Sequence, residues 1–413
     1  MLQNPEDRSF SKHFLFISTV NLTTNPRILK EIMLAHSSGY QVTFLGFKIG
    51  NWSDELDIEL QKKFSGINLI YLNATRKPFL PWAFSTVIEK VARVYNRIFS
   101  QGLRSIAFAS SKRSVLLYWQ LKKMSNTGQG FDLILAHTSG ALYPACWYAQ
   151  KNKTAFAFDV EDYHPWESIR GNGKHEVKRR EAILRKILPH ALYVSAAAPL
   201  IARQVNHLLP DVNVVTVYNS FPKQEFIPPA VIQSGKIKLV WFSQNINAGR
   251  GLELILQIWE QLKDNFDLTL IGKLDNLFYE QYLKGLEGVI LLPPMKQSAL
   301  HANLSQFDIG LAIDVDGEDD NRKLVITNKI LAYYQAGLYI VATNTPAQSH
   351  FILDNAFHGT LIEQTADSAQ KGLLALAEVK DRIRSESQKR FESASAFNWE
   401  KESRLLYEIW NKY

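Results

Sequence analysis

The sequence of 413 residues predicts an α/β protein with two doubly wound parallel sheets. Short apolar runs alternate with longer helical patterns along the chain, and the alternation restarts after a proline-containing polar stretch at 219–235. Near-continuous apolar strands that are each followed by a helix are typical of a parallel sheet buried on both faces. The length also exceeds what one hydrophobic core usually supports, so we expect two domains.

The first series of elements defines a domain over residues 1–220. It opens with an apolar strand at 13–18, followed by a helix in which Pro26 suits the first turn and Gly39 suits the stop. Six further strands are predicted at 41–47, 67–72, 131–136, 154–159, 191–195 and 212–217.

The second series defines a domain over 221–395, and a terminal helix at 396–413 is expected to pack back on the first domain. Its six strands are predicted at 236–242, 267–272, 288–293, 307–313, 338–343 and 359–362. Ligands of such sheets bind outside the carboxyl ends of the strands, so we expect the two domains to face a central cleft that holds the functional site.

The composition is that of an ordinary soluble globular protein, with 46% hydrophobic and 21% charged residues. The single cysteine, Cys146, excludes an internal disulfide and a cysteine-based zinc cluster, and the ten histidines are scattered without metal-ligand spacing. Residues 1–12 do not resemble a secretory signal, and no apolar run predicts a transmembrane helix. We therefore expect a cytoplasmic protein without a metal site.

Positive charge is concentrated between Arg76 and Met124, where ten Lys or Arg accompany one acid, Glu89. Nucleic acid, an anionic membrane surface or an anionic substrate would each suit such a patch, and so would a merely solvated helical face. No nucleic-acid recognition module is visible, so nucleic acid is not an expected partner.

Within this basic region, residues 78–99 predict an amphipathic helix with Trp82 and Phe84 near its start. Its apolar residues at helical spacing are Ile88, Val91, Tyr95 and Ile98. Two interpretations stay open. The stripe lies on an anionic leaflet at the inner membrane face, or it packs on the N-terminal sheet.

Residues 241–256 predict a phosphate-binding loop. A strand is expected to end at Phe242, a polar loop with Ser243 and Gln244 follows, and Arg250 and Gly251 lead into an amphipathic helix. Backbone N–H groups, a helix dipole and an arginine fork together suit a diphosphate. An ordinary turn with a surface arginine is the alternative.

Two further connections in the second domain add basic and amide side chains. Lys273 is expected just past the strand at 267–272. In the last connection, Thr327 or Asn328 can cap a helix that Gly337 ends. The candidate ligand contacts in this connection are Asn321, Arg322, Asn328 and Lys329.

Six segments, taken in order, resemble the retaining nucleotide-sugar glycosyltransferases of the GT-B fold, the large family four and its relatives. They are 25–47, 131–151, 158–167, 241–253, 327–348 and 397–410. The resemblance covers nearly the whole chain, except about 73–128. It implies two Rossmann-like domains, with a nucleotide-sugar donor bound mainly by the second and the acceptor against the first. Members usually work without a bound metal or other cofactor, so the protein itself must neutralise the departing diphosphate.

The resemblance also assigns donor-side residues. Arg250 matches the basic residue that precedes the loop glycine and contacts phosphate, and Lys273 would line the same wall. Asn328 and Lys329 match the Asn-Lys pair of the family, so the helix that begins there would direct its N–H groups at the diphosphate.

The sequence departs from the family at two acidic positions. Members commonly carry two glutamates eight positions apart, one for the transferred sugar and one for the nucleotide ribose. Here these positions are Leu324 and Ala332, whose side chains accept no hydrogen bond. Glu318, Asp319 or Asp320 is a candidate substitute for the first. The departure leaves the donor, and activity itself, open.

On the acceptor side, residues 158–167 concentrate polar groups just after a strand. Glu161 and Asp162 stand where the family often has a His-Glu pair, and with His164 they are the catalytic candidates. They would orient the acceptor hydroxyl or stabilise the reacting sugar. A capped loop in which Asp162 starts a turn is the alternative.

Three more residues are acceptor-side candidates. His137 ends an apolar strand, where a structural hydrogen bond and an acceptor contact are both consistent with a lone histidine. Asn25 and Arg27 stand at the first strand-to-helix turn and could face the cleft, although the glycine pair often found there in the family is absent.

These observations predict a hexosyl- or related glycosyltransferase that acts on a glycan or lipid-linked acceptor in surface polysaccharide or glycoconjugate assembly. The nucleotide diphosphate sugar is a co-substrate, and neither a metal nor another cofactor is expected. Two alternatives are a GT-B-like binding or scaffold protein that has lost catalysis, and a nucleotide-sugar epimerase of the same fold.

Overall fold

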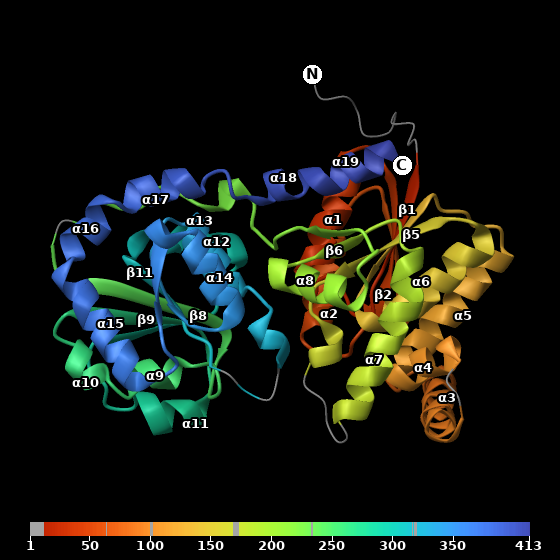
Figure 1. Ribbon diagram of the computed structural model, residues 1–413, viewed down its shortest axis with the longest axis horizontal. Coiled ribbons are helices and arrows are strands. Elements are labelled where there is room, and N and C mark those ends of the chain that lie inside the picture. Colours follow the sequence, from red (N-terminus) through yellow and green to blue (C-terminus); the bar gives the residue numbers. More distant parts are fainter. Residues whose placement is uncertain are drawn as a thin grey trace. The chain divides into compact units, whose positions relative to one another are not determined.

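The computed structural model describes residues 12–62, 64–99, 102–167, 173–232, 234–315, 317 and 320–413. The chain divides into two compact units (Figure 1). The first comprises Met1–Val217 and Leu405–Tyr413, and the second comprises Tyr218–Arg404. None of the helices in the described part of the chain combines the length and the hydropathy that a membrane span requires.

The first unit contains a seven-stranded parallel sheet in the order β3-β2-β1-β4-β5-β6-β7. Its strands are β1 (His13–Ile17), β2 (Gln41–Lys48), β3 (Ile67–Asn73), β4 (Leu133–His137), β5 (Ala155–Val160), β6 (Val194–Ala196) and β7 (Val214–Thr216). The chain runs outward from β1 to β3 on one side and then resumes at β4 on the other. The strand order therefore reverses between β1 and β4, which is the switch point of this sheet.

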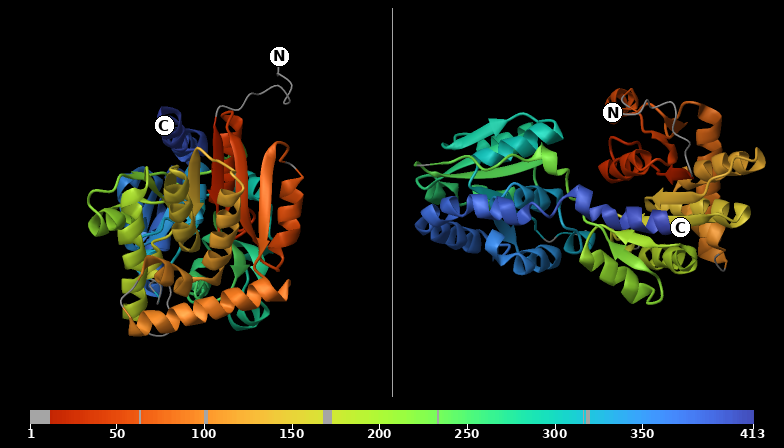
Figure 2. Two further views of the ribbon diagram at one scale, coloured as in Figure 1. Left: turned by 90° about the vertical axis from the view of Figure 1, so that its right-hand side faces the viewer. Right: turned by 90° about the horizontal axis from the view of Figure 1, so that it is seen from above.

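Helices flank this sheet (Figure 1, Figure 2). They are α1 (Pro26–Ser37), α2 (Ser53–Gln61), α3 (Phe79–Ile98), α4 (Leu103–Ser110), α5 (Lys112–Asn126), α6 (Ser139–Asn152), η2 (His164–Trp166), α7 (Gly173–Ile187), η3 (Leu188–His190), α8 (Pro199–Leu208) and α19 (Arg404–Lys412). The terminal helix is held by Trp410, which is fully buried, lies edge-on to Phe14 of β1 and donates from Nε1 to the Tyr193 hydroxyl at 2.8 Å.

The second unit contains a six-stranded parallel sheet in the order β10-β9-β8-β11-β12-β13. Its strands are β8 (Ile237–Ile246), β9 (Phe266–Leu274), β10 (Val289–Leu292), β11 (Ile309–Ala312), β12 (Tyr339–Thr343) and β13 (Gly359–Ile362). By the same argument, the switch point of this sheet lies between β8 and β11.

The second sheet is also flanked by helices (Figure 1). They are η4 (Lys223–Glu225), α9 (Leu252–Leu256), α10 (Trp259–Leu262), α11 (Asn276–Phe278), η5 (Tyr279–Leu283), α12 (Gln297–Asn303), η6 (Leu304–Gln306), η7 (Asp320–Lys323), α13 (Asn328–Gln335), α14 (Pro346–Asp354), η8 (Ala356–His358), α15 (Ala366–Glu378), α16 (Lys380–Ser385), α17 (Ser387–Ala394) and α18 (Trp399–Glu402). The core between the sheet and helices α9, α10 and α15 includes Trp241, Trp259 and Leu373, all fully buried.

Two predicted strand ends were wrong. Strand β8 continues to Ile246 instead of ending at Phe242, with a register shift between Phe242 and Asn245. Strand β9 continues to Leu274, so Lys273 lies within the strand. Gly272 makes this possible, because a Cβ at this position would lie 2.2 Å from the carbonyl oxygen of Ser243. The irregular part of β8 therefore passes directly over the glycine and pairing resumes beyond it.

Candidate functional site

Both units place polar side chains at the switch points of their sheets. In the second unit, Arg250 follows β8, while Asp314 and Lys329 follow β11. In the first unit, Asn25 follows β1 and His137 ends β4. Ligands of open parallel sheets bind at the carboxyl ends of the strands beside such a switch point, so each cluster is a candidate site.

The loop that carries Arg250 is anchored by Gly251, whose φ is +79°. A Cβ at this position would lie 2.8 Å from Cγ2 of Ile313 and 3.1 Å from its carbonyl group, so the loop packs directly against the end of β11. The amphipathic helix predicted after the loop is interrupted and forms the short helices α9 and α10. The loop therefore positions Arg250 beside β11. The short helix α9 supplies only a weak dipole at this loop.

Lys329 is the centre of a cationic cluster in the second unit. Its side chain is buried, and Nζ lies 5.5 Å from the centre of the Trp241 ring. Burial lowers the pKa of Lys329, Asp314 acts in the opposite direction, and the nearby cations Arg250 and Arg322 lower it further. Both arginines therefore lie close enough to Lys329 to repel its charge.

Asp314 is the acid of this cluster. Burial raises the pKa of its carboxyl group, while Lys329 and Arg322 oppose that shift, as does a 2.7 Å hydrogen bond donated by Gln348. One carboxylate against three cations leaves excess positive charge, which an anion such as a diphosphate would neutralise. The sequence prediction missed Asp314, although an acid directly after the apolar run at 307–313 marks the end of a strand.

Two polar atoms at the start of α14, the helix whose Gln348 bonds to Asp314, are buried without a hydrogen-bond partner among the described residues. They are the hydroxyl oxygen of Thr345, at the start of α14, and the amide oxygen of Gln348. Buried polar groups are ordinarily paired, so both atoms are candidates for contact with a bound polar ligand.

The other predicted donor-side residues are more dispersed. Arg322 is exposed and donates from Nη1 to the carbonyl oxygen of Gly249 at 3.4 Å, which links η7 to the loop of Arg250. Asn321 is buried in η7. Asn328 is exposed and accepts a 3.0 Å hydrogen bond from Asn219. Thr327 occupies the N-cap position of α13 but makes no capping bond.

Three predicted residues lie along β8 and β9. Ser243 and Gln244 occupy the irregular part of β8, where Ser243 is half-buried and Gln244 is exposed. Lys273 is exposed on β9. Since β9 and β11 flank β8 on opposite sides, Lys273 stands across β8 from the strand that carries Asp314.

The two positions where the family carries glutamates are apolar and buried, with Leu324 at 8% and Ala332 at 0% exposure. Asp320 accepts a 2.7 Å hydrogen bond from Lys323 on the same short helix. Glu318 and Asp319 lie outside the described residues. Within the described residues, Asp314 is the acid that interacts with the cationic cluster.

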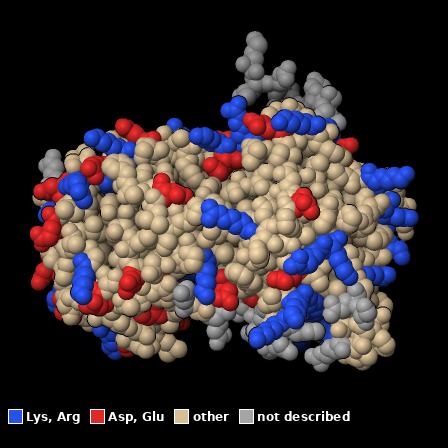
Figure 3. Space-filling model, viewed as in Figure 1, with Lys and Arg blue, Asp and Glu red and all other residues tan. Residues whose placement is uncertain are grey.

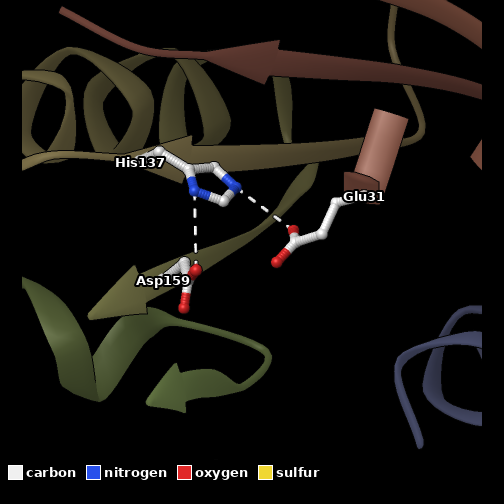
Figure 4. Close-up of side chains that lie close together, drawn as sticks. All are labelled: Glu31, His137 and Asp159. Carbon is white, nitrogen blue, oxygen red and sulfur yellow. Dashed lines mark hydrogen bonds and ion pairs between the residues drawn. The ribbon is translucent and has the colours of Figure 1, made fainter. Parts of the chain in front are cut away.

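In the first unit, His137 is the centre of a buried charge network (Figure 4). Its Nε2 lies 3.1 Å from Oε2 of Glu31 on α1 and its Nδ1 lies 3.5 Å from Oδ2 of Asp159, the two contacts that Figure 4 draws. Nδ1 also lies 2.8 Å from Oε1 of Glu161. Burial lowers the pKa of His137, but the facing carboxylates outweigh burial and raise the pKa to about 10. The ring is therefore an imidazolium at neutral pH, and both nitrogens donate.

Arg27 and Asp159 form the second ion pair of this network. The guanidinium donates from Nε and Nη2 to the two oxygens of Asp159, and from Nη1 to the carbonyl oxygen of Val217 at 2.7 Å. Burial raises the pKa of Asp159, but Arg27 and His137 outweigh it and hold the pKa below its usual value. Arg27 is therefore a buried ion-pair partner. The expectation that it faces a cleft was wrong, because each of its three nitrogens donates to a group inside the unit.

The ligand atoms of Glu31, His137 and Asp159 lie within 4.8 Å of one another, a spacing that could hold a metal ion. The charges favour a network of ion pairs over a metal site, because the cations Arg27 and His137 already balance the carboxylates of Glu31 and Asp159. Burial nevertheless raises the pKa of Glu31, with His137 opposing that shift. Sequence reasoning missed Glu31, and it counted Asp159 among the polar residues of 158–167 without making it a site candidate.

Glu161 is the member of the network that reaches solvent, with 23% of its side chain exposed. Its Oε1 accepts a 2.6 Å hydrogen bond from Asn25 in addition to the bond from His137. Asn25 is fixed in turn, because its side-chain oxygen caps α1 by accepting from the Ile28 backbone N–H at 3.0 Å. Asn25 and His137, which were predicted on the acceptor side, therefore hold Glu161, a predicted catalytic residue, in position.

Asp162 and His164 continue from Glu161 into η2. The carbonyl oxygen of Asp162 accepts from the His164 backbone N–H at 2.9 Å, so Asp162 does begin a turn. His164 is buried, with Nδ1 3.1 Å from Oε1 of Glu167. Burial lowers the pKa of His164, but Glu167 outweighs it and raises the pKa. His164 therefore pairs with Glu167 on its own turn.

Comparison with solved structures identifies the architecture. Sucrose-phosphate synthase from Thermosynechococcus elongatus matches with a TM-score of 0.64 and 13% identity over 97% of this chain and 98% of that chain. HepE from Anabaena in complex with UDP matches with a TM-score of 0.66 and 12% identity over 97% and 100%. The chain has the GT-B fold. The lipopolysaccharide outer core galactosyltransferase WaaB also matches, with a TM-score of 0.58 and 11% identity over 93% and 99%. Comparison of the sequence with family models and with curated proteins finds no match.

Proposed function

We propose that this GT-B protein is a glycosyltransferase that moves a sugar from a nucleotide diphosphate sugar to a hydroxyl group of an acceptor. The observation that carries the proposal is the cluster of Arg250, Arg322 and Lys329 at the switch point of the second sheet. The similar HepE is described in complex with UDP and with UDP-glucose, which supports a nucleotide-sugar donor. Cations fixed around the diphosphate would stabilise the charge that develops as it departs.

The proposed chemistry assigns the acceptor to the first unit. Glu161, held by His137 and Asn25, would accept a hydrogen bond from the acceptor hydroxyl and orient it. The leaving phosphate would take the proton, and the anomeric configuration would be retained. The three cations would do the neutralising work without a bound metal ion. The acceptor would be a glycan or lipid-linked intermediate of surface polysaccharide or glycoconjugate assembly.

Donor recognition would differ from that of the resembling family. Leu324 and Ala332 are buried and accept no hydrogen bond from the sugar or the ribose. The acid near the cationic cluster is Asp314, whose carboxylate accepts a hydrogen bond from Gln348. We assign Asp314 as the acid that would accept hydrogen bonds from donor hydroxyl groups. The same two apolar positions favour the alternative of a binding or scaffold protein without catalysis.

Calorimetric titration of the full chain with uridine, guanosine, adenosine and thymidine diphosphates tests the proposal. One diphosphate should bind, and the matching nucleotide sugars should be hydrolysed slowly without an acceptor. Binding without any hydrolysis or transfer would favour the scaffold protein. Interconversion of two nucleotide sugars without an acceptor would identify an epimerase. If none of the diphosphates binds, the cationic cluster is not a donor site.

A further inference from the structure

Helix α3 presents most of its large apolar side chains to solvent, although Trp82 and Ile88 are half-buried and Phe84 also stacks against Trp119 of α5. The inward positions are Ser85, Ala92 and Asn96, all buried. The outward positions are Leu80, Phe84, Val87, Val91, Val94 and Ile98, with exposures between 54% and 78%. Their spacing alternates between four and three residues, which keeps all six on one face of the helix. Of the apolar residues predicted at helical spacing, Val91, Tyr95 and Ile98 are exposed and Ile88 is half-buried. The interpretation that this predicted stripe packs on the N-terminal sheet is therefore wrong.

The inward face shows why α3 holds this orientation. The Asn96 side chain donates to the carbonyl oxygen of Ser105 at 2.8 Å and accepts from the Ser105 hydroxyl at 2.9 Å. Arg93 donates from Nε to the carbonyl oxygen of Ala109 at 3.0 Å. These bonds fix α3 against α4, so the exposed stripe cannot turn inward without breaking them.

The free face is long enough for a substantial contact. Twenty helical residues extend about 30 Å. Figure 2 shows α3 running along the outer edge of the first unit, with no other element of that unit beyond it. Exposed apolar surface of this extent marks a contact with a partner or a membrane.

Cations border this stripe. Lys77 and Lys90 are exposed, and Arg76 and Lys112 both lie 5.3 Å from the centre of the Trp82 ring, which gathers two charges near the start of α3. Over the face drawn in Figure 3, Lys and Arg side chains gather on the first unit. Glu89, the acid of this basic region, already accepts from Arg93 at 2.7 Å.

These charges distinguish two possible partners of the α3 stripe, a second copy of the helix and an anionic bilayer. The spacing of the stripe would also suit the α3 helix of a second copy. A two-fold interface would bring two copies of the same basic region together, however, and their single acid is already paired. An anionic bilayer complements the cations and accepts the apolar side chains together, as interfacial amphipathic helices require.

We infer that α3 docks the protein on an anionic lipid surface, with the stripe from Leu80 to Ile98 in the interfacial layer and the flanking cations at the headgroups. The inference stands independently of the proposed sugar transfer, since it uses no residue of either candidate site. Attachment would be reversible, because it combines a shallow apolar contact with a few charges and includes no membrane span.

Co-sedimentation with vesicles tests this inference. The full chain should pellet with vesicles of phosphatidylcholine and phosphatidylglycerol at low salt, and should remain in the supernatant with phosphatidylcholine alone or at high salt. Phe84→Gln combined with Val91→Gln should weaken partitioning about tenfold or more. Lys77→Gln combined with Lys90→Gln should weaken it about fivefold for each lysine removed.

Matched controls distinguish binding through the α3 stripe from nonspecific binding through any exposed apolar or basic side chain. Leu353→Gln removes an exposed leucine of the second unit, and a double Lys284→Gln, Lys371→Gln variant removes two exposed lysines there. Neither should change partitioning.

The inference is overturned if the wild-type chain stays in the supernatant with anionic vesicles, or if the controls weaken binding as much as the α3 variants. It is also overturned if sedimentation velocity shows a dimer that Phe84→Gln dissociates, because the occupant is then a second copy. Nucleotide binding, measured without vesicles, reports separately on the proposed function.

Discussion

The imidazole Nδ1 of His137 lies 2.8 Å from Oε1 of Glu161, so a fully buried cation holds a carboxylate that reaches solvent. Behind the ring, Glu31 and Asp159 supply the opposite charge that keeps His137 protonated. Because Asn25 donates to the same oxygen of Glu161, that carboxylate has little freedom to rotate. Such preorganisation is what a group needs when it must orient a reacting hydroxyl.

The protonation of His137 gives a pH-dependent prediction for stability. Its pKa is raised from 6.5 to about 10 by the folded structure, so its stabilising contribution is fully present below 6.5 and is lost as the pH rises toward 10. We expect His137→Gln to lower the free energy of unfolding by about 3 kcal/mol below pH 6.5, because it leaves buried carboxylates without their cation. Urea unfolding of both proteins across this pH range should show the difference shrinking, and a constant difference would contradict the assignment of charge.

Glu161 itself should matter for turnover and not for donor binding. Glu161→Gln keeps the size of the side chain and removes the charge, so we expect turnover to fall about a hundredfold or more with little change in nucleotide affinity. Steady-state kinetics together with calorimetric nucleotide binding measures both quantities. A parallel loss of nucleotide affinity would place Glu161 in donor binding.

Asp162→Asn tests the neighbouring carboxylate in the same way. We expect reduced turnover with nearly unchanged donor affinity, because the substitution keeps size and hydrogen bonding but removes negative charge near the reacting sugar. Wild-type turnover would instead assign Asp162 only to the turn that it begins before η2.

On the donor side, Arg250→Ala should raise the donor KM and lower kcat. A single charge-assisted contact contributes about 1.5–3 kcal/mol, which corresponds to roughly ten- to a hundredfold in kcat/KM. Lys296→Ala, which removes an exposed lysine elsewhere in the second unit, is the control. Equal effects from both substitutions would mean that Arg250 has no specific role.

Metal removal tests whether this cationic cluster neutralises the diphosphate without a metal ion. If Arg250, Arg322 and Lys329 neutralise the diphosphate, a chelator should leave turnover unchanged, and added Mg²⁺ or Mn²⁺ should not rescue Arg250→Ala. Loss of activity with the chelator and its return with Mn²⁺ would show that a metal ion shares this work.

The sequence patterns predicted the strands well because buried strands of a parallel sheet are continuously apolar. They failed at the ends of β8 and β9, where exposed polar residues such as Asn245 and Lys273 still pair. Local patterns also place charges on the outside, so Glu31 on the inner face of α1 went unnoticed. The bond between Arg27 and Asp159 joins positions 132 residues apart, and no local spacing predicts it.

Two glycines of one loop provide the last prediction. Gly249 and Gly251 have similar backbone angles, with φ of +78° and +79°, but a Cβ on Gly249 would meet nothing within 4 Å while one on Gly251 would lie 2.8 Å from Ile313. Gly249→Ala should therefore cost only the backbone strain of about 1 kcal/mol. Gly251→Ala adds a clash with β11 that must shift the loop, so it should also raise the donor KM by displacing Arg250. Comparing unfolding free energies with kinetics for the two variants separates strain from positioning. Equal donor KM values would show that the packing of Gly251 on β11 does not position Arg250.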